Sequence, residues 1–110
     1  PDAVLVFIDP LFTPHAARIA ELGAALNLPI FGGSRLFAQA GFVATYGSDL
    51  AASARRSALY VKRILQGAKP ADLPIEQPTE FELFVNARSA KALGLDLPPA
   101  LLARANEVFR

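Results

Sequence analysis

Apolar residues follow two alternating patterns along the first part of this chain. Residues 3–8 are continuously apolar, as in a strand that is covered on both faces within a parallel sheet. Through residues 16–26 the apolar positions repeat at helical spacing, after Thr13 as the expected N-cap and Pro14 at the first helical position. This predicts a strand and then an amphipathic helix that packs on the sheet.

The same alternation continues to residue 46. Residues 29–31 and 42–46 are predicted to be short strands, because each is apolar and adjoins glycine turns. A brief helix is expected over 35–40, between these strands. Strands joined by helices and short turns predict an α/β fold with a doubly wound parallel sheet in three αβα layers.

The longest helix is expected over about 50–66, with Asp49 as its N-cap and Gly67 as its C-cap. Its basic residues, Arg56 among them, lie mainly on one side and are expected to be solvated. The other side should dock on an apolar surface. That side consists of Leu50, Ala54, Ser57, Ala58, Val61, Ile64 and Leu65.

After this helix the pattern indicates a stiff connector and a return to the sheet. Three prolines between residues 69 and 79 favour an extended path, and acidic side chains around it, such as Glu76, are expected to be solvated. A fourth strand is predicted over 81–86, and a short helix over 87–93. Pro98-Pro99 should open a last helix. Its expected buried residues are Leu101, Leu102, Ala105, Val108 and Phe109.

Composition narrows the class of protein. The 110 residues are 53% hydrophobic, enough for a core and of single-domain size, so one compact unit is expected. Eleven basic and ten acidic residues are scattered, which gives no footprint for nucleic acid. Cysteine is absent, which excludes disulfides and a thiol nucleophile. His15 is the only histidine and is too isolated for a metal cluster or a catalytic relay, so neither a metal nor a cofactor is expected.

Candidate binding residues follow the predicted strands. Asp9 ends the first strand, where open α/β sheets bind ligands, and its carboxylate could accept a hydrogen bond from a ligand amine or hydroxyl. It could equally shape the turn before Pro10. Phe12, Ser34, Tyr46 and Gly47 also follow strand ends, and each has an equally simple structural role as a turn or packing residue.

Several motifs, taken in order, resemble one family. They are the opening Asp-Ala-Val-Leu-Val-Phe-Ile-Asp of residues 2–9, Gly41 with the strand to Tyr46-Gly47, the segment Tyr60 to Gly67, and the tail from Gly67 to Leu95. In this order the chain resembles the last third of the ABC-transporter substrate-binding proteins of the tryptophan-binding type. The resemblance implies part of a lobe of the two-lobed type I periplasmic binding fold, in which the lobes enclose a small ligand.

By this resemblance, residues 1–46 and 79–110 belong to the carboxyl-terminal lobe, and the helix within 49–67 to the other lobe. The family's site position after the first strand corresponds to Asp9. Amino-acid-binding relatives often have Asn next, where this chain has Pro10. With the first lobe outside the chain, the apolar side of the long helix lacks its usual cover, so self-association is expected.

The resemblance implies a binding protein and not an enzyme: a receptor that delivers an amino acid or another small solute to an ABC permease. Such a receptor is periplasmic or otherwise extracytoplasmic, with a signal peptide upstream of these residues. The alternative is a ligand-sensing domain of the same fold, attached to a signalling or DNA-binding module. A third hypothesis, with little support from the residues, is a small flavodoxin-like enzyme that uses Asp9 and Ser34.

Overall fold

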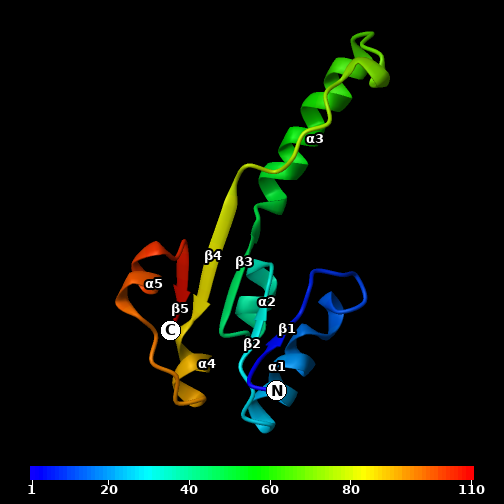
Figure 1. The fold of residues 1–110 in the computed structure, drawn as a ribbon. Coiled ribbons are helices and arrows are strands. Elements are labelled where there is room, and N and C mark those ends of the chain that lie inside the picture. The colour runs from blue at the N-terminus through cyan, green and yellow to red at the C-terminus, as the bar shows by residue number, and fades with distance from the viewer. The chain divides into compact units, whose positions relative to one another are not determined.

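A five-stranded sheet in the order β1-β2-β3-β4-β5 organises the computed structural model, which describes residues 1–110 (Figure 1). β1 with β2, β2 with β3, and β4 with β5 pair in parallel, while β4 runs opposite to β3 in Figure 1. The strands are β1 (Val4–Leu5), β2 (Ile30–Gly32), β3 (Ala44–Ser48), β4 (Phe81–Asn86) and β5 (Glu107–Phe109). The predicted α/β class is confirmed.

Helices alternate with these strands as the apolar pattern predicts. The α-helices are α1 (Ala16–Ala25), α2 (Arg35–Ala40), α3 (Leu50–Leu65), α4 (Ala87–Ala92) and α5 (Pro99–Arg104). Two short 3-10 helices are added, η1 (Thr13–His15) and η2 (Pro70–Asp72). Residues 1–47 with 82–110 form one compact unit and residues 48–81 form a second, where length alone suggests one unit.

The core of the first unit lies between helices α1 and α2 and one face of the sheet. Ala16, Ile30, Phe37 and Phe42 form its buried cluster, and the rings of Phe37 and Phe42 stack with centroids 4.8 Å apart. α1 and α2 also contact each other. Burying aromatic rings removes the largest apolar areas from water, so this cluster fixes the positions of the first three strands.

The opposite face of the same strands is open in this chain. Val4 and Val6 pack toward the core, whereas Leu5 and Phe7 are 62% and 76% exposed. Leu5, Phe31 and Ala44 are register partners on neighbouring strands, so they form one row on that face. Residues 3–8 are therefore covered on one face only, since Leu5 and Phe7 on the other face are largely exposed.

Asn86 ties two helices of the first unit to the sheet. It is buried at the end of β4, where its side-chain nitrogen donates to the Ala38 carbonyl of α2 at 2.9 Å. Its side-chain oxygen accepts from the Ser89 backbone N–H, also at 2.9 Å, and so caps the N-terminus of α4.

Two local predictions are wrong. Thr13 does not cap a helix; its hydroxyl donates to the Asp9 carbonyl at 3.0 Å, because a 3-10 turn precedes α1. The last predicted helix ends at Arg104, and the residues from Glu107 to Phe109 instead pair with β4. β-branched and aromatic residues beside an open sheet edge gain a hydrogen-bonded ladder that a short helix cannot offer.

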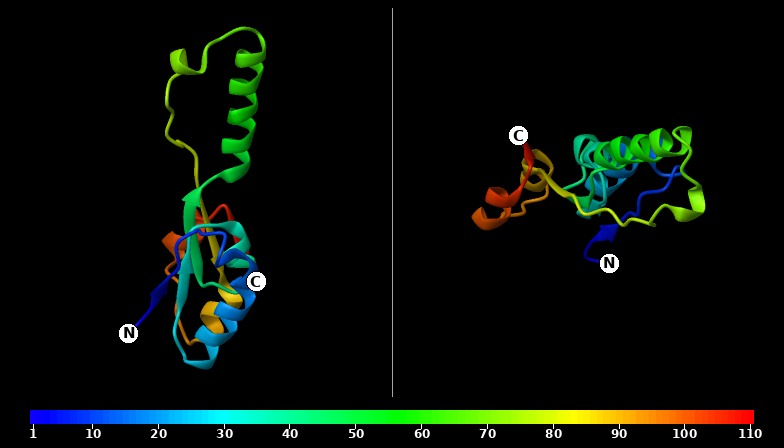
Figure 2. Two further views of the ribbon diagram at one scale, coloured as in Figure 1. Left: turned by 90° about the vertical axis from the view of Figure 1, so that its right-hand side faces the viewer. Right: turned by 90° about the horizontal axis from the view of Figure 1, so that it is seen from above.

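The second unit consists of α3 and the connector that returns alongside it (Figure 2). Asp49 caps α3 by accepting from the Ala52 N–H at 2.9 Å, as predicted, whereas the C-cap is Gln66 and Gly67 follows it with φ of 105°. None of residues 48–81 is buried. The apolar side of α3 is exposed, with Leu65 at 82%, so this unit has no core of its own.

Replacing Thr45 by valine should stabilise the first unit. Thr45 is 2% exposed and its hydroxyl has no hydrogen-bond partner, which leaves a desolvated polar group in the core. Thr45→Val should therefore raise the free energy of unfolding by about 1 kcal/mol, measured by urea denaturation. Thr13→Val is the matched control and should not stabilise, because it loses the bond to Asp9. A loss of stability in Thr45→Val would contradict the prediction.

Candidate functional site

The carboxyl ends of β1, β2 and β3 meet at one edge of the first unit. Gly33 follows β2 and Gly47 lies in β3, and a Cβ atom on Gly47 would overlap the Gly33 carbonyl oxygen. On the other side, the Ile8 side chain lies 3.0 Å from where a Cβ of Gly33 would be. The backbones at the ends of β2 and β3 are therefore in close contact, with the Ile8 side chain packed against Gly33, and glycine is needed where β2 and β3 approach.

Asp9 holds the loop that follows β1. Its Oδ1 accepts from the Leu11 N–H at 2.8 Å, and its carbonyl accepts from the backbone N–H groups of Phe12 and Thr13. These bonds confirm that Asp9 shapes the turn, one of the two roles that the sequence allows. Its second carboxylate oxygen, Oδ2, has no protein partner and the residue is exposed, so it can still accept a hydrogen bond from a ligand.

The other four sequence-predicted residues lie at the ends of the same three strands. Phe12 is partly exposed in the loop after β1. Ser34 is half-buried at the N-cap of α2, and its hydroxyl makes no capping bond. Tyr46 is 64% exposed near the end of β3, beside the half-buried Gly47. All five positions thus lie at or after the carboxyl ends of these strands; their role in ligand binding remains a prediction.

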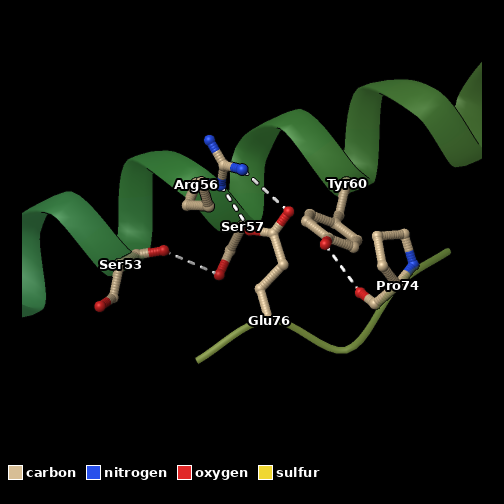
Figure 3. Close-up of polar contacts among 6 residues, drawn as sticks. All are labelled: Ser53, Arg56, Ser57, Tyr60, Pro74 and Glu76. Carbon is tan, nitrogen blue, oxygen red and sulfur yellow. Dashed lines mark hydrogen bonds and ion pairs between the residues drawn. The ribbon is translucent and has the colours of Figure 1, made fainter. Parts of the chain in front are cut away.

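A second group of polar side chains joins α3 to the segment Pro74–Glu80, here named the strap. The Nε and Nη2 atoms of Arg56 both donate to the Glu76 carboxylate, with Nη2 2.8 Å from Oε1 (Figure 3). The Tyr60 hydroxyl donates to the Pro74 carbonyl at 2.8 Å, and the Asp49 N–H donates to the Glu80 carbonyl at 3.0 Å. Arg56 and Glu76 are exposed, as expected, but they also form an ion pair that was not predicted.

A groove of about 700 Å³ lies between α3 and the strap. From α3 it is lined by Asp49, Ala52, Ser53, Arg56, Ser57 and Tyr60, and from the strap by Pro74 and by Glu76 to Glu80. The i, i+4 spacing of Arg56 and Tyr60 places them on one helix face, which was visible in the sequence. Which segment faces them was not, because the path of a proline-rich connector has no periodic signal.

The ion pair changes the titration of its members. Hydrogen bonding from Arg56, the largest cause, lowers the pKa of Glu76 to about 2. The same carboxylate raises the pKa of Arg56. The pKa of Tyr60 is raised first by desolvation of its phenol and then by the Glu76 carboxylate. Because a charged group is favoured beside its opposite charge, the pair persists well below neutral pH.

No group of three or more His, Asp and Glu side chains is arranged to hold a metal ion. None of the helices combines the length and apolar character needed to cross a membrane.

Three solved structures superpose on this chain and share its fold. A "conserved domain protein" from Vibrio cholerae superposes with a TM-score of 0.92 at 27% identity, over 97% of this chain and 36% of that chain. An "ABC domain in complex with L-Trp" from Streptococcus pneumonia gives 0.91 at 24%, over 98% and 37%. CD0873, a substrate binding protein with adhesive properties from Clostridium difficile, gives 0.66 at 20%, over 96% and 36%.

The family follows from the sequence itself. The model of the ABC transporter substrate binding protein family matches residues 1–109, so the chain belongs to this family. A search of curated proteins finds no match. The chain spans just over a third of the length of the solved structures that it matches.

The titration of Glu76 tests its ion pair with Arg56, which joins the strap to α3. Its side-chain carboxyl should titrate near pH 2, below the ordinary value of 4.5, as followed by NMR. Any stability from the pair is then complete above pH 4.5 and lost as the pH falls toward 2. Arg56→Gln should raise the midpoint toward 4.5. Arg55→Gln, one position away, should leave it in place; a midpoint near 4.5 in the parent would refute the contact.

Proposed function

We propose that this chain is part of the solute-binding component of an ABC importer, and that its ligand binds at the carboxyl ends of β1, β2 and β3. The observation that carries the proposal is the close approach of Gly33, Gly47 and the Ile8 side chain at one sheet edge; Asp9, Ser34 and Tyr46 are their direct neighbours in the chain. Open α/β sheets bind ligands at this edge. Membership of the substrate-binding family supports a recognition role without bond chemistry.

Each residue at this edge has a distinct task in the proposal. The free Oδ2 of Asp9 accepts a hydrogen bond from a ligand amine or hydroxyl, and the uncommitted Ser34 hydroxyl donates or accepts. Phe12 and Tyr46 supply partly exposed aromatic surface for the ligand's apolar part. Gly47 lets the ligand approach the backbone, because it carries no side chain.

The ligand is an amino acid or another small solute. A solved relative of similar fold is described in complex with L-Trp, which supports an amino acid as the first class to test. Pro10, directly after Asp9, has neither a backbone N–H nor a polar side chain to offer a ligand. Recognition of a polar ligand therefore falls on Asp9 and Ser34 more than on the residue that follows Asp9.

The two compact units correspond, in this proposal, to pieces of two lobes. Residues 1–46 and 79–110 belong to the carboxyl-terminal lobe, and the helix within 49–67 belongs to the other. The unit borders at residues 47–48 and 81–82 support this division. So does the absence of any buried residue in 48–81, because a helix without a core normally packs on more chain than is present here.

The proposed setting is extracytoplasmic, with a signal peptide upstream and a permease that receives the solute. The 110-residue chain alone should also associate with itself through the apolar side of α3, since that side is exposed. The permease and the second copy of the chain are proposed partners, which go beyond the family assignment.

Asp9 provides the direct test of the ligand site. Asp9→Asn keeps the Oδ1 acceptor for the Leu11 N–H but removes the charge, so affinity for an amine-bearing solute should fall about tenfold or more while the melting temperature changes little. Calorimetry of the full-length protein against amino acids, small carboxylates and sugars measures this. Asp72→Asn, in the connector, is the matched control. Unchanged affinity in Asp9→Asn would remove Asp9 from the site.

Light scattering tests the association of the 110-residue chain. The parent should show a concentration-dependent mass above that of a monomer, and Val61→Glu should shift it toward the monomer by charging the exposed apolar side of α3. Lys62→Glu changes the charge more but lies on the polar side, so it should have little effect. A monomeric parent at high concentration would contradict self-association.

A further inference from the structure

The strap and α3 touch at three points that follow one line along the helix. The helix contributes the Asp49 N–H, the Arg56 guanidinium and the Tyr60 hydroxyl, while the strap contributes the Glu80 carbonyl, the Glu76 carboxylate and the Pro74 carbonyl. The order is reversed between the two partners, so the strap runs antiparallel to the helix. Positions 49, 56 and 60 are spaced by seven and four residues and therefore share one helix face.

The two segments also match in length. From Asp49 to Tyr60 a helix rises about 16 Å, and from Pro74 to Glu80 an extended chain covers about 20 Å. A nearly straight strap can therefore keep all three contacts at once. Pro74 and Pro78 stiffen it, because each ring fixes φ and restricts the residue before it.

Little else holds the strap in place. It forms neither helix nor strand, its residues are exposed, and Ile75 is fully so. No backbone N–H within it makes a backbone hydrogen bond. An exposed ion pair alone contributes little to stability, but a bidentate fork adds geometric specificity, and here it adds to a Tyr60 bond one helical turn away.

We propose that Arg56, Tyr60 and Glu76 are positioning residues that lock the strap onto α3. The strap and the helix of the second unit then move together as one rigid body. The contact between Asp49 and Glu80 then joins the segment that enters α3 to the segment that leaves the strap. Bending is confined to the residues at the unit borders, 47–48 and 81–82. The inference does not depend on which solute the protein binds.

Spin labels measure this locking directly. The chain has no cysteine, so Lys62→Cys and Ile75→Cys place one label on α3 and one on the strap of the full-length protein without competing sites. Both positions are exposed and neither takes part in the three contacts. Electron–electron double resonance should give a narrow distance distribution in this background. Adding Tyr60→Phe and Glu76→Gln should broaden it at least twofold.

Two further variants separate locking from general destabilisation. In the labelled parent, the charge swap Arg56→Glu with Glu76→Arg keeps an opposite pair. It should therefore keep most of the narrow distance distribution. Lys69→Gln removes an exposed cation of the same unit whose side chain touches neither the strap nor Asp49, and it should leave the distribution narrow. Hydrogen exchange at the Asp49 amide should quicken about tenfold when the contacts are removed and recover in the swap.

The proposal is overturned if Tyr60→Phe with Glu76→Gln leaves the distance distribution as narrow as in the labelled parent. It is also overturned if Lys69→Gln broadens it equally, because loss of any cation in this unit would then suffice. Failure of the solute-binding proposal would not affect these readouts, since none of them uses a ligand.

Discussion

The close approach of Gly33 and Gly47 is the constraint on which the candidate site depends. A side chain at Gly47 would overlap the Gly33 carbonyl, so the ends of β2 and β3 can meet only because that position lacks a Cβ atom. The core beneath, where Phe37 stacks on Phe42, holds the same strands in register. Backbone contact at the edge and aromatic packing below it together hold the ends of β2 and β3 close to each other.

The two units are stabilised by different physics. The first buries a cluster of apolar side chains, so its geometry follows from area removed from water. The second buries nothing and is ordered by helix caps and by polar contacts between α3 and the strap. Polar contacts in water give direction more than energy. In a unit of this kind, polar contacts define the internal geometry, but stability depends on packing against other surfaces.

Much of the fold could be predicted from the sequence where one pattern decided each element. Asp49 and Gly67 bound α3 because cap chemistry is local, and β4 matches its predicted range because its apolar run is bounded on both sides. The segment from Glu107 to Phe109 was missed because its strand exists only through pairing with β4, a non-local contact. The positions of the five candidate residues near the strand ends could be predicted from topology. The contact between Arg56 and Glu76 could not, because they lie twenty positions apart and meet only through the path of the strap.

Asn86 places a further demand on the chain. Its amide serves two helices at once: one end donates to the Ala38 carbonyl and the other accepts from the Ser89 N–H. Aspartate would keep the cap but lose the donor, serine would be too short to reach both groups, and glutamine would be one methylene too long. Of these four side chains only asparagine serves both groups, so such a change would disturb α2 and α4 together, although neither helix itself is altered.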